Sequence, residues 1–166
     1  MKLCFKGMKI SGVLGILPET VCHFEEEIGN YSFPERQTRK LKDIMGFDQH
    51  RIAKMTSTAS DFCIYGLNHL VDTGKVKAEE IGAIVVVTMS QDYLIPNISN
   101  IIHGECGLDT DVICIDIAQA CCGYLYGIIQ SCMLLQQLEG KKVILFNTDV
   151  FSRKISRHDR SSYPLT

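Results

Sequence analysis

The sequence lacks the features that mark several large classes of protein. Its 17 lysines and arginines are balanced by 19 aspartates and glutamates, so the net charge is only −2. A nucleic-acid-binding domain is usually strongly basic, and we expect no nucleic-acid partner. The longest apolar runs, such as residues 83–89, are too short to span a membrane. Hydrophobic residues make up 46% of the chain and charged residues 22%, which excludes a disordered, collagen-like or coiled-coil protein.

Metal and nucleotide motifs are also missing. The chain has 8 cysteines but no C-x-x-C or C-x-x-H pair, so the sequence predicts no metal site. It has no G-x-G-x-x-G and no G-x-x-x-x-G-K phosphate loop, and we expect no bound cofactor. Cys63, Cys114 and Cys132 lie within apolar runs, where a free cysteine acts as a small hydrophobic residue. This usage indicates a reducing cytoplasm rather than a disulfide framework.

The remaining pattern predicts an α/β fold. Three apolar runs rich in β-branched residues predict strands that are buried on both faces, at 81–89, 112–117 and 143–146. Helical spacing of apolar residues predicts helices at 58–70, 97–107 and 122–138. We also expect a short strand at 9–13 and a polar helix that opens at 18–20, whereas residues 30–44 are poorly patterned. Strands that alternate with helices indicate a mostly parallel sheet in one domain.

One cysteine stands where such a fold can do chemistry. Cys121 follows the strand at 112–117 and directly precedes the helix at 122–138. Backbone N–H groups and the dipole at a helix N-terminus stabilise an anion, so a thiolate is favoured there and becomes a usable nucleophile. The same N–H groups can bind an oxyanion. Gly123 permits either close approach of a substrate or a tight helix contact.

Other interpretations of these residues stay open. Cys121 and Cys122 can form a buried structural pair or a disulfide, although disulfides are rare in the cytosol. His103 is a candidate base only if its helix packs over the strand ends. A basic cluster forms either a solvated face or a docking surface for an acidic partner. Its members are Arg36, Arg39, Lys40 and Lys42.

The segment that holds Cys121 resembles a known family. Residues 116–124 (Asp-Ile-Ala-Gln-Ala-Cys-Cys-Gly-Tyr) are similar to the nucleophile segment D-x-x-x-A-C-x-G-F of β-ketoacyl-acyl-carrier-protein synthase III. Residues 45–52, 81–97 and 142–160 resemble further segments of that family in the right order. The resemblance covers about residues 8–166 and implies a thiolase-like fold, with residues 1–166 as its N-terminal half-domain and a mostly parallel mixed sheet with helices on both faces. The second half, which carries the family's catalytic histidine and asparagine, is missing from the sequence.

The resemblance also implies a reaction and partners. Cys121 would take an acyl group from acyl-CoA or an acyl carrier protein for decarboxylative Claisen condensation with a malonyl thioester, in fatty-acid or related lipid or polyketide synthesis. Arg160 matches an arginine that contacts the coenzyme A adenine, but the chain has no tryptophan to stack on that ring, which favours a carrier-protein donor. Ile95 matches a residue that reaches the partner's acyl pocket across the interface of a homodimer, and it implies a longer or branched acyl chain.

Three functional hypotheses follow. The first is a cytoplasmic acyltransferase of the synthase III type, although the fragment alone is not expected to condense substrates. The second is a non-catalytic thiolase-fold partner or half-domain. The third is a related enzyme such as a polyketide starter synthase.

Overall fold

The computed structural model describes residues 2–31, 33–46, 48–156 and 162. The chain forms two compact units, one of residues 1–15 and 58–149 and one of residues 16–57 and 150–166. The expectation of a single half-domain over residues 1–166 stays a prediction.

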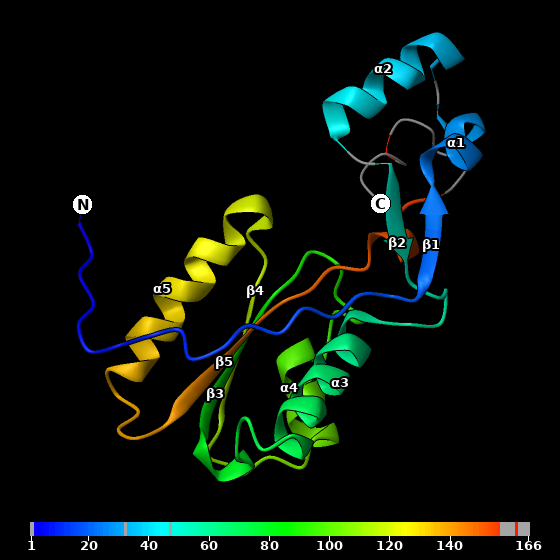
Figure 1. Cartoon of the computed structure of the whole chain (residues 1–166). Coiled ribbons are helices and arrows are strands. Elements are labelled where there is room, and N and C mark those ends of the chain that lie inside the picture. The colour runs from blue at the N-terminus through cyan, green and yellow to red at the C-terminus, as the bar shows by residue number, and fades with distance from the viewer. Residues whose placement is uncertain (1, 32, 47, 157–161, 163–166) are drawn as a thin grey trace. The chain divides into compact units, whose positions relative to one another are not determined.

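A parallel sheet forms the centre of the larger unit. Strand β3 (Ile81–Val87) lies between β4 (Ile113–Ile117) and β5 (Lys142–Asn147), and both neighbours run parallel to it (Figure 1). Every residue of β3 is buried. Its β-branched side chains suit a strand that is covered on both faces. The three strands predicted from the apolar runs are therefore confirmed, but only β3 is buried throughout, because the residues of β4 and β5 are partly exposed.

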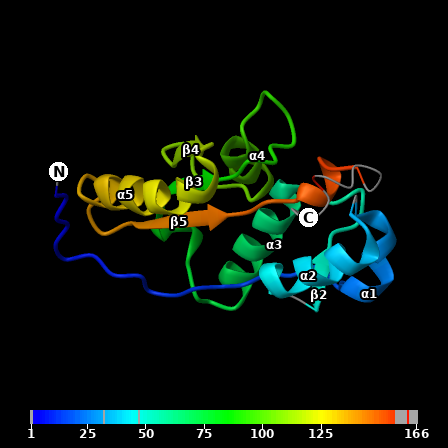
Figure 2. The same ribbon diagram turned by 90° about the horizontal axis from the view of Figure 1, so that it is seen from above.

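Helices cover both faces of this sheet. Helix α5 (Gly123–Leu135) contacts β3 and β5, whereas α4 (Ile98–Glu105) contacts β3, β4 and helix α3 (Ala59–Asp72). Figures 1 and 2 show α5 on one side of the strands and α3 with α4 on the other. Short 3₁₀ turns precede β3 and α5, namely η2 (Ala78–Glu80) and η3 (Ala120–Cys122). The predicted α/β fold with helices on both faces is confirmed.

Two glycines bring α5 unusually close to the sheet. A Cβ atom on Gly127 would lie 2.7 Å from Leu145 Cδ1 and 2.8 Å from Val87 Cγ2. A Cβ atom on Gly123 would lie 2.5 Å from Val87 Cγ1. None of these three distances is compatible with ordinary packing, so the helix can take this position only because both residues lack a side chain.

The smaller unit contains short elements around an aromatic pair. Strands β1 (Thr20–His23) and β2 (Gln49–Ile52) pair antiparallel. The rings of Phe24 and Tyr31 are buried with their centroids 5.4 Å apart. The helices and 3₁₀ turns of this unit are α1 (Phe24–Glu27), η1 (Ile28–Asn30), α2 (Glu35–Met45) and η4 (Phe151–Arg153).

Several expectations for the first third of the chain are wrong. Residues 9–13 form no strand, and the polar helix expected from 18–20 is instead β1 followed by the single turn of α1. The poorly patterned residues 30–44 contain most of α2. The sheet is accordingly not mixed: within the described ranges, the antiparallel pair β1–β2 is separate from the all-parallel sheet.

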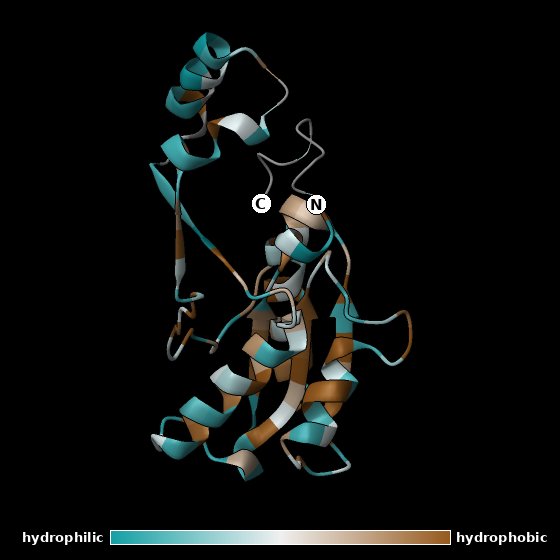
Figure 3. Cartoon of the chain, turned by 90° about the vertical axis from the view of Figure 1, so that its right-hand side faces the viewer, coloured by the Kyte–Doolittle hydropathy of each residue, from teal (hydrophilic) through white to brown (hydrophobic). Residues whose placement is uncertain are grey.

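The strands of the parallel sheet and helix α2 differ in the hydropathy of their residues. Figure 3 shows the three parallel strands mostly hydrophobic and α2 mostly hydrophilic. Over the part of the chain that the structure describes, no helix has both the length and the apolar character needed to cross a bilayer.

We expect Gly127→Ala to destabilise the chain by about 1–3 kcal/mol, because the new methyl group overpacks against Leu145 and Val87. Gly104→Ala in α4 is the matched control. No atom lies within 4 Å of its added Cβ, so the better helix propensity of alanine should be neutral or raise stability by up to about 1 kcal/mol. Urea unfolding followed by far-UV circular dichroism measures the free energy of unfolding of both variants. Equal stability of the two variants would contradict the close contact.

Candidate active site

Loops from all three parallel strands meet at the carboxyl edge of the sheet. Thr88–Ser90 follow β3, η3 follows β4, and Thr148 and Asp149 follow β5. The ladder extends into this edge, because Thr88 N donates to Ile117 O at 3.1 Å and Thr148 N donates to Val87 O at 3.1 Å. In open α/β sheets, binding and catalytic sites form at this edge.

Cys121 lies at this edge, at the start of α5. The backbone at Ala120 is in the left-handed region with φ 46°, a conformation that costs a residue other than glycine about 1–2 kcal/mol. This turn leads the chain from β4 into η3, so that Cys121 is two residues before the first residue of α5. The predicted strand-to-helix turn is confirmed. Because η3 runs directly into α5, with Gly123 N donating to Ala120 O, Cys121 lies in the first turn of a continuous helical segment, where the N–H groups before that bond have no partner within the helix.

The structure decides between the interpretations of the cysteine pair. Cys121 and Cys122 are both free and exposed, so the buried pair and the disulfide are wrong. The Cys122 thiol donates a hydrogen bond to Gln119 O at 3.0 Å and so closes the 3₁₀ turn. Cys122 thus has a local structural contact, whereas Cys121 presents an exposed thiol beside it.

Burial makes three other thiols less acidic. Cys63 is buried, and desolvation raises its pKa to about 12. Desolvation also raises the pKa of Cys106 and of Cys114, with smaller contributions from the charges of Glu105 and Asp116 respectively. Because the thiolate is the nucleophile, these three cysteines are poor candidates for covalent chemistry.

Two aspartates fix the helices that begin at this edge. Asp116 Oδ2 accepts from Ile98 N at 2.8 Å, and its Oδ1 accepts from Ser99 N at 2.9 Å, at the N-terminus of α4. Asp92 Oδ1 accepts from Ala59 N at 3.1 Å, at the N-terminus of α3. Each carboxylate satisfies unpaired helix N–H groups and complements the helix dipole.

A third aspartate joins the loops that follow β3 and β5. Asp149 Oδ1 accepts hydrogen bonds from Thr88 Oγ1 at 3.1 Å, Met89 N at 2.8 Å and Ser90 Oγ at 2.9 Å. Thr88 and Ser90 are buried, so their hydrogen bonds to this acceptor offset the cost of removing both hydroxyl groups from water. Sequence reasoning assigned no role to Asp92, Asp116 or Asp149. The available signal was an aspartate near the carboxyl end of a predicted strand, within β4 for Asp116 and after β3 and β5 for Asp92 and Asp149.

The other predicted site residues lie in different surroundings. Gly123 is buried against Val87, which is the tight helix contact considered above. Ile95 is 87% exposed in the loop between β3 and α4, and its role toward an acyl chain stays a prediction. Arg160 lies outside the described residues. Its contact with coenzyme A also stays a prediction.

His103 is not part of this arrangement. The N-terminus of α4 lies beside Asp116, near the carboxyl end of β4. From there the helix runs antiparallel to β4, toward the residues that precede that strand. The His103 ring Nε2 lies 2.8 Å from Asp109 O, before β4 begins. The structure therefore places His103 at the opposite edge from Cys121, and its candidacy as a base is wrong.

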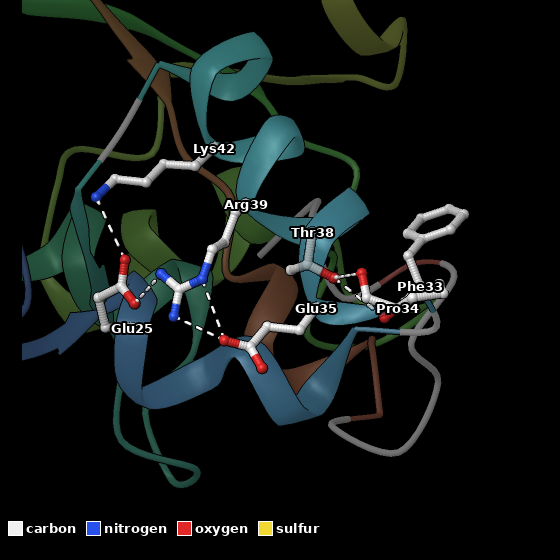
Figure 4. A network of polar contacts seen from close by, with 7 residues as sticks. All are labelled: Glu25, Phe33, Pro34, Glu35, Thr38, Arg39 and Lys42. Carbon is white, nitrogen blue, oxygen red and sulfur yellow. Dashed lines mark hydrogen bonds and ion pairs between the residues drawn. The ribbon is translucent and has the colours of Figure 1, made fainter.

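Two of the four residues of the basic cluster, Arg39 and Lys42, form ion pairs within their own unit. Figure 4 shows Arg39 between Glu35 and Glu25, at 2.8 Å and 2.6 Å, and Lys42 beside Glu25. Lys42 also pairs with Asp48 at 2.6 Å. These contacts raise the pKa of Arg39 and of Lys42 and lower the pKa of Asp48. The pairs favour a solvated, ion-paired face over a surface of unpaired charge.

We expect iodoacetamide to label Cys121 faster than any other cysteine of the folded chain near neutral pH. Cys63 should stay unlabelled until the chain is unfolded, because burial raises its pKa to about 12. Peptide mass spectrometry after timed labelling measures each site. Equal rates for Cys121 and the adjacent Cys122 would show that the helix N-terminus does not activate the thiol.

We expect Asp149→Ala to lower the free energy of unfolding by about 2 kcal/mol or more, because Thr88 and Ser90 then lose a buried acceptor. Asp149→Asn retains one carbonyl oxygen and should lose less. Urea unfolding of both variants gives the comparison. An alanine variant as stable as the asparagine variant would mean that the shared oxygen contributes little.

No model of a known protein family matches the chain. Individual proteins of known family are nevertheless similar to it in sequence. A putative 3-oxoacyl-[acyl-carrier-protein] synthase 3 from Campylobacter jejuni is 28% identical over 166 residues, which is 99% of this chain and 47% of that protein. A β-ketoacyl-[acyl-carrier-protein] synthase III from Levilactobacillus brevis is 32% identical over 161 residues, again 47% of its length.

A solved structure agrees with these relatives on the fold. A 3-oxoacyl-(acyl-carrier-protein) synthase from Burkholderia xenovorans superposes with a TM-score of 0.77 at 22% identity, over 88% of this chain and 41% of that one. The chain thus spans about half the length of the relatives it matches. The chain is similar to β-ketoacyl-acyl-carrier-protein synthase III over one half of such an enzyme, and its fold is thiolase-like and partial.

Proposed function

We propose that this chain is the N-terminal half of a cytoplasmic acyltransferase of the β-ketoacyl-acyl-carrier-protein synthase III type, with Cys121 as its nucleophile. The observation that carries the proposal is the exposed Cys121 thiol at the N-terminal end of α5, on the carboxyl edge of the sheet. A thiol in this position gains from the positive end of the helix dipole, which favours its anionic form.

The proposed chemistry begins with transfer of an acyl group to Cys121. The thiolate attacks the carbonyl carbon of an acyl thioester, and the negative charge moves to the carbonyl oxygen. Backbone N–H groups at the start of α5 are suited to stabilise that oxyanion. The intermediate then collapses, the carbon–sulfur bond to the donor breaks, and the donor leaves as a thiolate that takes up a proton. Acyl-Cys121 remains.

Condensation follows in the proposal. A malonyl thioester loses carbon dioxide, and the electron pair of the broken bond forms a carbanion that attacks the acyl carbonyl of acyl-Cys121. The bond to Cys121 sulfur breaks, and the thiolate is regenerated. The resemblance assigns activation of the malonyl thioester to a histidine and an asparagine in the other half of the enzyme. We therefore propose that acylation, and not condensation, is within the reach of the 166 residues.

The surface of α5 supports a role as part of a larger enzyme. Leu125, Tyr126 and Met133 are between 50% and 61% exposed, although a helix that is apolar on all sides is normally buried. Such a surface suits contact with further protein. The proposal accordingly includes the second half and a homodimer, with an acyl carrier protein and thioesters as partners. Arg160 and Ile95 are its proposed substrate-binding residues, beside Gly123.

A non-catalytic half-domain is the second candidate. A polyketide starter synthase would share the same acylated cysteine, so acylation does not distinguish it from the first proposal. The range of acyl donors that it accepts would distinguish the two.

Incubation with acyl-CoA or acyl carrier protein thioesters tests the proposal. We expect the chain to gain one acyl group, and we expect Cys121→Ser to abolish the gain because the oxygen nucleophile is far weaker. Cys122→Ser is the matched control and should retain acylation. Intact-protein mass spectrometry detects the product, and a donor series from acetyl to longer and branched chains tests the predicted role of Ile95. Acylation that survives Cys121→Ser, or none with any donor, would favour the second candidate.

A further inference from the structure

Three metal-ligating side chains meet in the smaller unit. Cys22 on β1 and His50 on β2 are direct cross-strand partners in the antiparallel pair. Such partners project to the same face of the two strands. Glu27, the last residue of α1, lies against them. One ligand atom from each of the three residues lies within 4.8 Å of the others.

The cluster is shielded from solvent. Glu27 is 6% exposed, and its Oε2 lies 2.6 Å from His50 Nε2. Cys22 and His50 are partly buried. A carboxylate with so little contact with water requires a positive or hydrogen-bonding partner close by. Glu27 also acts on its surroundings, since burial first and the charge of Glu27 second raise the pKa of Tyr31.

The donor set suits one class of cation. Thiolate, imidazole and carboxylate together are typical ligands of Zn²⁺, and three protein ligands with one open position are common at such sites. Bond lengths of about 2.0–2.3 Å in tetrahedral geometry place the ligand atoms roughly 3.3–3.6 Å apart. His50 Nε2 and Glu27 Oε2, which lie 2.6 Å apart, must therefore separate by less than about 1 Å. Cys22 Sγ lies within 4.8 Å of both atoms and must approach them by at most about 1.3 Å.

We propose that Cys22, Glu27 and His50 bind a divalent cation of the zinc class, which joins β1, β2 and α1. Inspection of spacing along the chain does not reveal this site. Its ligands come from three elements, and strand pairing, not sequence proximity, brings Cys22 and His50 together. The inference does not depend on the proposed acyl transfer, because it concerns other residues in a different compact unit.

Cobalt(II) titration of the full chain under reducing conditions tests this site. The exposed thiols of Cys4, Cys121 and Cys122 could also bind the metal, so the reference protein carries serine at these three positions. We expect one cobalt ion per chain, with a thiolate-to-cobalt charge-transfer band and a tetrahedral ligand-field spectrum. Added zinc should displace the cobalt and remove both signals.

Ligand variants identify the residues that hold the metal. Cys22→Ser should remove the charge-transfer band, and Glu27→Gln and His50→Gln should weaken binding by at least about tenfold. His23→Gln and Glu26→Gln are matched controls, since both residues are exposed in the same β1–α1 segment, and they should leave binding unchanged. Circular dichroism verifies folding. If Cys22→Ser fails to fold, Glu27→Gln, which can still hydrogen bond to His50, gives the decisive comparison.

Two results would overturn the proposal. One is a cobalt spectrum that persists unchanged in Cys22→Ser or in folded Glu27→Gln. The other is no binding at all by the folded reference protein, which would leave His50 and Glu27 as a hydrogen-bonded pair beside a thiol.

Discussion

The position of Cys121 depends on how closely α5 approaches β3. Gly123 and Gly127 let the helix axis come so near that a single methyl group would overlap Val87 or Leu145. Because the thiol precedes the helix by only two residues, any shift of α5 away from the sheet moves it too. The left-handed turn at Ala120 makes the connection from β4 short enough for this arrangement. Packing in the apolar layer therefore determines where the candidate nucleophile stands.

Around this thiol, three carboxylates order the polar edge of the sheet. Asp92 and Asp116 bind the N-termini of α3 and α4, and Asp149 holds the loops after β3 and β5 together. Each of them replaces water at backbone or hydroxyl donors that the fold would otherwise leave unpaired. Such anchored loops keep a reactive thiol in a defined environment, since site geometry depends on supporting hydrogen bonds as much as on the reacting group. The apolar layer thus determines the position of α5, whereas the polar edge orders the loops beside the thiol.

The larger unit could be predicted from the sequence because its signals are local. The apolar runs of β3, β4 and β5, the helical spacing of apolar residues in α3 and the apolar character of α5 are each complete within one segment, and the turn that holds Cys121 follows from their order. The smaller unit could not. Strands β1 and β2 have four residues each and are stabilised by pairing between distant positions, and α2 consists mostly of charged and polar residues with few apolar ones. The same distance in sequence concealed the Cys22, Glu27 and His50 cluster. The roles of the three aspartates depend on loop geometry, which composition does not encode.

The place of β3 in its sheet also bears on how the chain is made. Both partners of β3 follow it in sequence, and parallel neighbours need a crossover instead of a tight turn. As the polypeptide leaves the ribosome, β3 can pair with β4 only after α4 has been synthesised, and with β5 only after α5. The seven residues of β3 are all buried in the folded unit, yet both edges of this strand lack their partners until β4 and β5 have been synthesised. An unpaired strand edge is a template for pairing with another chain, so β3 is fully protected from such pairing only once β5 has been made.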